Sequence, residues 1–201
     1  MAYLQTCFPV TIGGWDTSKV TTMYGMFRNC TGFDQPIGGW DTSSVTNMGY
    51  MFANTPFNQS LTNWVTTGVT SMSYMFYNAD SFNGNLSGWD VSNVESMSYM
   101  FYGAHSFNNP SITGWNTSSL TNMERTFAYC TGFNQPIGNW DTSNVTTMYE
   151  TFYSQLQGPS TFDQDIGNWD TSNVTSMYRM LTNWNYASPF NNGGSPSISG
   201  S

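Results

Sequence analysis

A tryptophan recurs at nearly constant spacing along the chain, and this repeat constrains the fold more than any other sequence feature. The intervals between consecutive members are 25, 24, 25, 26, 25 and 29 residues. A fixed period of about 20 to 50 residues is typical of stacked repeat proteins, because one repeat cannot bury its own apolar side chains. The sequence therefore predicts a single solenoid of seven turns. Its tryptophans are Trp15, Trp40, Trp64, Trp89, Trp115, Trp140 and Trp169.

Other apolar positions keep the same phase relative to each tryptophan. A branched aliphatic residue stands three residues before it, a valine or leucine five residues after it, and a methionine three residues further on. We expect residues 1–190 to form the solenoid, and residues 191–201, rich in Ser and Gly, to form a flexible tail. Each turn starts near a phenylalanine: Phe8, Phe33, Phe57, Phe82, Phe107, Phe133 and Phe162.

The spacing of apolar residues within one repeat predicts its secondary structure. In the third repeat Val69, Met72 and Phe76 stand at i, i+3 and i+7, which is the apolar stripe of a short helix. The Trp-Asp-Thr-Ser segment before it offers side-chain oxygens that can cap a helix. The Ile-Gly-Asn-Trp type of segment predicts one brief strand, paired in parallel with those of neighbouring turns. We therefore expect an α/β repeat solenoid with one short parallel strand and one short helix per turn.

A family resemblance rests on the same residues. The run from Phe133 to Met148, FNQPIGNWDTSNVTTM, resembles the 25-residue repeat of BspA-like leucine-rich-repeat surface proteins, in the variant common in Mycoplasma lipoproteins. Seven phased copies, from about Phe8 to Leu181, carry the resemblance. It implies a leucine-rich-repeat-like right-handed solenoid and a surface-exposed role in cell adhesion, and it implies no catalytic residues.

The charge balance restricts the partners of the chain. Four Lys and Arg residues stand against 12 Asp and Glu residues, which gives a formal net charge of −8 at pH 7. Because phosphate binding needs clustered Lys and Arg, this composition argues against nucleic acid and against an anionic membrane surface. We expect an extracellular or surface-exposed location, on a cell or a virion, because Asn, Thr, Ser and Gly must cover the surface. We expect neither a signal peptide nor a transmembrane segment in this chain.

Tyrosines at outward-looking positions of the expected helices are the candidate contact residues. Exposed tyrosine offers rigid amphipathic area for sugar rings or for protein surfaces. The alternative is that the tyrosines only pack over neighbouring turns as a shielding ladder. They form two columns, with Tyr50, Tyr74 and Tyr99 in one and Tyr77, Tyr102 and Tyr153 in the other.

A row of aspartates gives weak candidates for metal ligands. Stacked carboxylates repel each other unless a cation or hydrogen bonds relieve the repulsion, so calcium is one interpretation. The alternative is that each aspartate caps its own helix, and Val65 and Asn116 interrupt the row. The residues concerned follow five of the tryptophans: Asp16, Asp41, Asp90, Asp141 and Asp170.

Catalysis is not expected. His105 is the only histidine, so the chain has no serine–histidine triad and no histidine-based metal cluster, and it also lacks a glycine-rich phosphate loop with lysine. We expect no cofactor. The leading interpretation is a non-enzymatic adhesion or recognition module that binds a protein or glycan on a cell surface through the solenoid face.

The ends of the repeat array favour an alternative function. No polar capping repeat is evident, and Phe8, Ile12 and Trp15 are expected at an open N-terminal end. The alternative is a virion structural protein, a decoration or fibre subunit, that assembles with neighbouring subunits through uncapped ends.

Overall fold

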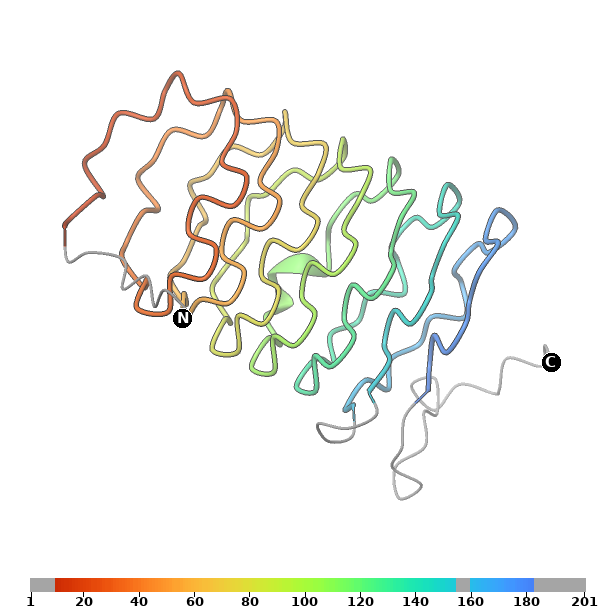
Figure 1. Ribbon diagram of the computed structural model, residues 1–201. Coiled ribbons are helices and arrows are strands. Elements are labelled where there is room, and N and C mark those ends of the chain that lie inside the picture. Colours follow the sequence, from red (N-terminus) through yellow and green to blue (C-terminus); the bar gives the residue numbers. More distant parts are fainter. Residues whose placement is uncertain (1–9, 155–159, 183–201) are drawn as a thin grey trace.

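Each repeat of the chain forms one turn of a coil. The computed structural model describes residues 10–154 and 160–182 of the 201-residue chain. Successive turns lie side by side in a single row, so that the order of the turns in space follows their order in the sequence (Figure 1). A residue at one position of a repeat therefore lies beside its counterparts in the neighbouring repeats.

The expected fold class, an α/β solenoid with a leucine-rich-repeat-like helix and strand in every turn, is wrong. Among the described residues the only helix is a 3-10 helix, η1 (Pro110–Ile112), and no strand extends beyond a single bridge. One parallel bridge instead joins each turn to the next. The bridging residues run in order through Thr22, Asn47, Ser71, Ser96, Asn122, Thr147 and Ser176.

The segment predicted as a helix is a series of β-turns. In the third repeat the Met75 amide donates to the Met72 carbonyl oxygen at 3.1 Å, which closes a four-residue turn. The Tyr74 amide donates instead to the Ser98 carbonyl oxygen of the next turn, at 2.9 Å. Tyr74 has a left-handed φ of 60°, which a right-handed helix cannot include. Consecutive turns that span i to i+3 also bring every third or fourth residue inward, so they reproduce the apolar spacing of a helix.

The segment predicted as a strand is also a turn. In the second repeat the Trp40 amide donates to the Ile37 carbonyl oxygen at 3.1 Å, and Gly38 and Gly39 lie between them. The Trp40 indole N–H then donates to the Ile12 carbonyl oxygen of the preceding turn, at 3.1 Å. The tryptophan therefore joins two turns through its side chain rather than through a strand ladder.

Columns of aromatic rings fill the interior of the coil. The Phe76 ring is fully buried, and its centroid lies 3.8 Å from that of Phe82. The rings of Phe52 and Phe101, in the turns on either side, lie 5.5 and 5.6 Å from it. The buried apolar residues form one core cluster that runs through the described turns. Burial of these rings is the main force that holds the turns together.

Buried threonines add hydrogen bonds between turns. The Thr42 hydroxyl donates to the Val65 carbonyl oxygen, and the Thr66 hydroxyl donates to the Asp90 carbonyl oxygen, each at 2.8 Å. Because these hydroxyls have partners, their burial does not cost the free energy of an unsatisfied polar group. The threonine two residues after the tryptophan thus links turns rather than capping a helix. The threonines with such a bond are Thr17, Thr42, Thr66, Thr117 and Thr142.

Candidate binding surface

The tyrosines of the middle turns gather in two stacked columns. The Tyr50 and Tyr74 rings lie 4.3 Å apart with an interplanar angle of 6°, and Tyr74 and Tyr99 lie 4.4 Å apart at 8°. The second column brings Tyr77 and Tyr102 to 4.8 Å. Tyr74 and Tyr77 lie 5.6 Å apart, so the two columns adjoin. We call this surface the tyrosine face; all five of these residues are half-buried and none stands on a helix.

The first column has an unusual backbone conformation. Tyr50, Tyr74 and Tyr99 have φ values of 58°, 60° and 57°. For an L-residue with a side chain, this left-handed conformation costs about 1–2 kcal/mol. In the first described turn the equivalent position is Gly25, with a φ of 62°, and glycine accepts this conformation without the cost. The chain therefore carries bulky aromatic side chains where glycine would strain the backbone less.

Burial affects the hydroxyl groups of three tyrosines on this face. Burial, together with the nearby tyrosines, raises the pKa of Tyr102 to about 12. Burial also raises the pKa of Tyr74 well above its usual range, and that of Tyr99 in the same direction. These three hydroxyl groups are thus neutral at pH 7 and can donate and accept hydrogen bonds.

The structure extends the face beyond the residues chosen from the sequence. Tyr153, chosen for the second column, is only 5% exposed, and its ring meets that of Tyr129 edge-on at 5.5 Å. The sequence analysis missed four further tyrosines of this face: Tyr24, Tyr129, Tyr149 and Tyr178. Three of them, Tyr24, Tyr149 and Tyr178, directly follow the methionine that stands eight residues after the tryptophan. Their shared repeat position could have identified them.

All three arginines of the chain lie against tyrosine rings of this face. The guanidinium carbons of Arg28 and Arg125 lie 4.6 Å from the Tyr50 ring centroid and 5.4 Å from that of Tyr99. Arg179 lies 5.1 Å from the Tyr178 ring centroid. Such cation–π contacts contribute about 0.5–2 kcal/mol each, depending on exposure. In a chain with a net charge of −8, nearly all of the positive charge is therefore placed on one surface.

Arg125 is held by partners within the fold. Its Nε donates to Glu150 at 2.5 Å, and its terminal N–H donates to the Tyr99 hydroxyl at 2.8 Å. Burial lowers the pKa of Arg125, but these hydrogen bonds and the Glu150 charge outweigh it and raise the pKa above its usual value. Glu150 is only 3% exposed, so this ion pair is structural.

A shallow hollow lies at the edge of the face that is nearest to the N-terminal turns. Its volume is about 170 Å³. It is lined by Arg28, Tyr50, Ala53, Asn54, Tyr74 and Tyr77.

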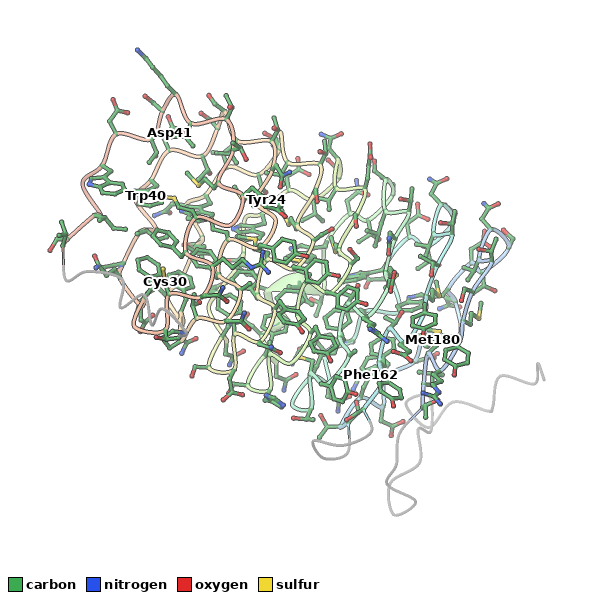
Figure 2. All side chains as sticks on the ribbon, viewed as in Figure 1. Tyr24, Cys30, Trp40, Asp41, Phe162 and Met180 are labelled. Carbon is green, nitrogen blue, oxygen red and sulfur yellow. The ribbon has the colours of Figure 1, made fainter. Side chains whose placement is uncertain are left out.

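Hydrogen bonds account for the aspartate row. The Asp41 carboxylate accepts hydrogen bonds from the Ser43 hydroxyl at 2.6 Å and from the Ser43 amide at 2.9 Å. In the described residues no group of three or more histidine, cysteine or acidic side chains comes together. Figure 2 labels Asp41 near the upper edge of the coil and Tyr24 below it. Hydrogen bonds from the serine two residues on lower the pKa of Asp16, Asp41, Asp90, Asp141 and Asp170.

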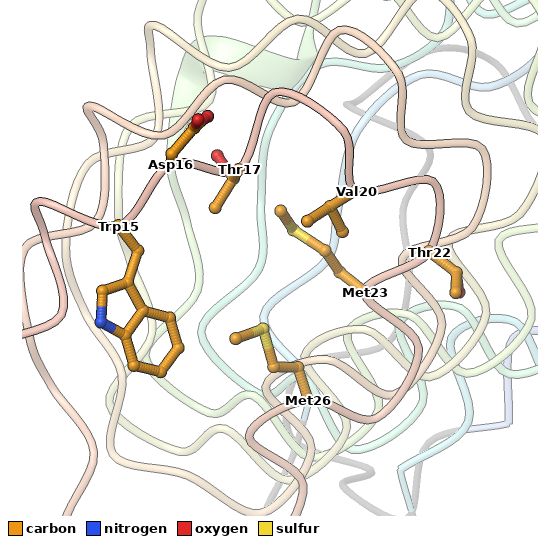
Figure 3. Close-up of a pocket in the computed structure, with 7 residues that line it drawn as sticks. All are labelled: Trp15, Asp16, Thr17, Val20, Thr22, Met23 and Met26. Carbon is orange, nitrogen blue, oxygen red and sulfur yellow. The ribbon is translucent and has the colours of Figure 1, made fainter.

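A second hollow, of about 440 Å³, lies in the first described turn (Figure 3). Trp15 is 52% exposed there, whereas Ile12 is buried. Phe8, also expected at this end, lies outside the described residues. The lining residues are Trp15, Asp16, Thr17, Val20, Thr22, Met23 and Met26.

The fold and the tyrosine face define a class of protein: a repeat protein whose stacked turns present an aromatic, arginine-bearing surface. The chain belongs to the family described as Mycoplasma protein of unknown function, DUF285, which matches residues 2–114 and 106–195. This family is associated with BspA-like repeat surface proteins. No curated protein and no solved structure matches the chain. In the part of the chain that the structure describes, no helix is long and apolar enough to cross a membrane.

Proposed function

We propose that this protein is a non-enzymatic, surface-exposed recognition module that binds a glycan or a protein on a cell surface through the tyrosine face. The supporting observation is the column of Tyr50, Tyr74 and Tyr99 in left-handed backbone conformations. The left-handed φ belongs to the repeat position itself, since Gly25 and Arg125 share it, so the support comes from bulky tyrosines at a position that glycine would occupy without cost. The association of the family with surface proteins supports the same proposal.

The physical properties of the face suit recognition. Tyr74 is stacked between Tyr50 and Tyr99, so its ring is fixed before a ligand arrives. A side chain that is already ordered loses little conformational entropy on binding. The partly exposed rings supply apolar area, and the neutral hydroxyls supply hydrogen bonds. These are the two contributions that a sugar ring or a protein surface requires.

Replacement of two rings tests this proposal. Tyr74→Gly combined with Tyr99→Gly is expected to weaken binding to glycan arrays and to cell surfaces by at least roughly 30-fold, since an interface hot spot contributes about 2 kcal/mol or more. Glycine suits the backbone, because Gly25 occupies the equivalent position with the same sign of φ. The measurement is the affinity of the double variant relative to wild type.

Two controls accompany this experiment. Val65→Ala changes an exposed residue outside the tyrosine face and is expected to leave the affinity unchanged. The melting temperature of each variant shows whether the fold persists. A folded double variant that binds as tightly as wild type would exclude the tyrosine face as the binding surface.

A second candidate function is a virion structural role, in which the protein assembles through its ends. The exposed Trp15 and the hollow beside it favour this alternative. Each described indole of the later turns is buried, so Trp15 is the exception. An exposed indole at the end of a repeat array is a place where a neighbouring subunit can pack.

Sedimentation velocity over a hundredfold range of protein concentration distinguishes the two functions. Under the leading proposal we expect a monomer whose sedimentation coefficient does not change with concentration. Regular oligomers or filaments that disappear in Trp15→Ser would instead favour assembly through the ends. Glycan and cell-surface binding would then be a secondary property of the assembled particle.

A further inference from the structure

The charge of Arg28, unlike that of Arg125, is available to bind a ligand. Its side chain is exposed, and its guanidinium carbon lies 4.6 Å from the Tyr50 ring centroid. Among the described residues no carboxylate lies within 4.0 Å of it, whereas Arg125 is paired with Glu150. The stacked tyrosine ring holds the planar guanidinium but leaves its N–H groups to donate elsewhere. A fixed guanidinium of this kind binds a carboxylate through two parallel hydrogen bonds.

Asn54, which lines the same hollow, belongs to a ladder of asparagine amides. The Asn54 side-chain amide donates to the Asn29 side-chain oxygen at 2.6 Å, and the Asn78 amide donates to the Asn54 oxygen at 3.1 Å. Each of these amides keeps hydrogen-bonding capacity beyond the ladder, because an amide has two N–H donors and two acceptor lone pairs. Their mutual hydrogen bonds fix their orientation. The hollow is therefore lined by one amide, that of Asn54, whose orientation the ladder fixes.

The size and chemistry of the hollow indicate its ligand. A volume of about 170 Å³ suits a single ring rather than a folded protein segment. The edge of the Tyr74 ring and the Tyr77 ring supply apolar area for a sugar ring, and the amide of Asn54 can bind its hydroxyl groups. The positive charge of Arg28 stands out on a chain with a net charge of −8. An anionic group is thus attracted at this point and repelled over most of the remaining surface.

We propose that the Arg28 hollow binds the carboxylate-bearing ring of an acidic glycan. Arg28 holds the carboxylate, Tyr74 and Tyr77 pack against the ring, and Asn54 binds the ring hydroxyls. This assignment rests on the proposed function, since it requires that the tyrosine face be the binding surface. It adds the chemical class of the ligand and the residue that selects it.

A glycan array tests the assignment. The array carries uronic-acid oligosaccharides and sialylated glycans, each beside its carboxyl-reduced counterpart. Wild-type protein is expected to retain at least one acidic form roughly tenfold more strongly than its reduced counterpart, in line with hydrogen bonds to charged groups. Arg28→Ala is expected to lose this preference, and Arg28→Lys to recover only part of it, because lysine lacks the planar fork.

Lys19→Ala provides the matched control. It removes the same charge from an exposed loop residue outside the tyrosine face, and it is expected to leave the preference unchanged. If Lys19→Ala weakens binding as much as Arg28→Ala does, general electrostatic attraction explains the preference and the Arg28 site is excluded.

The outcomes separate this inference from the proposed function. Equal retention of acidic and reduced glycans, abolished by Tyr74→Gly with Tyr99→Gly, would overturn the acidic-sugar site and keep the recognition module. Binding only to a protein or an acidic peptide through the same tyrosines would also overturn the acidic-sugar site and keep the recognition module. Loss of the acid preference in Arg28→Ala alone would support the inference. If no binding to glycans or cell surfaces depends on the tyrosines, both proposals fail.

Discussion

Phe76→Ala is expected to lower the free energy of unfolding by about 3–5 kcal/mol. The Phe76 ring is fully buried in the middle of the coil. It stacks on the Phe82 ring and on the rings of Phe52 and Phe101 in the turns on either side. Its removal leaves a cavity that the neighbouring rings cannot fill without breaking their own stacking. Urea denaturation followed by tryptophan fluorescence measures the change.

Two comparisons define the origin of this effect. Phe76→Leu keeps most of the volume and is expected to cost less than about half as much. Phe27→Ala, in the first described turn, is expected to cost less than Phe76→Ala, because Phe27 is 7% exposed and stacks on fewer neighbouring turns. A loss below about 1 kcal/mol in Phe76→Ala would show that the ring columns do not carry the stability of the stack.

Gly138→Ala is expected to destabilise the protein by about 2 kcal/mol or more, although alanine ordinarily replaces glycine without loss. A methyl group at Gly138 would overlap the Asp165 carbonyl oxygen in the next turn. The new methyl group would be attached to the backbone of one turn, and the carbonyl oxygen belongs to the backbone of the next. The overlap can therefore be relieved only by separating the two turns. Thermal denaturation of the variant measures the effect.

Gly39→Ala gives the matched control for Gly138→Ala. Gly39 occupies a neighbouring position in an earlier repeat, and a methyl group there would meet no atom within 4 Å. Gly39→Ala is expected to leave stability unchanged or to raise it by up to about 1 kcal/mol, because it restricts the unfolded chain. Effects of the same sign at the two positions would contradict the close approach of turns at Gly138.

The stacking of repeats could be predicted from the sequence, but the conformation of each repeat could not. The regular tryptophan spacing indicates that Trp40 and Trp64 occupy equivalent places in adjacent turns. The spacing of Met72, Met75 and Phe76 is the same in a helix and in consecutive β-turns, so it does not distinguish them. The choice is made by hydrogen bonds such as that from Tyr74 to Ser98, which join distant parts of the sequence.

The tyrosine columns follow from the repeat register, and so does the face on which the arginines lie. Tyr50, Tyr74 and Tyr99 occupy one repeat position, and stacking brings them together. Arg125 occupies the same repeat position in a later turn, two residues after the methionine, and Arg28 occupies the position of the second tyrosine column, so the register places both arginines on this face. The contact of each guanidinium with one tyrosine ring could not be predicted, because it depends on side-chain conformations that the repeat pattern does not specify.

Backbone chemical shifts of the third repeat test the central claim most directly, namely that turns without helices place the tyrosines on one face. We expect no run of helical shifts from Met72 to Ala79, and we expect shifts typical of positive φ at Tyr74 and Asn78. The Tyr74 amide is also expected to exchange slowly with solvent, because it donates to Ser98. An uninterrupted run of helical shifts across these residues would contradict the fold and, with it, the tyrosine face.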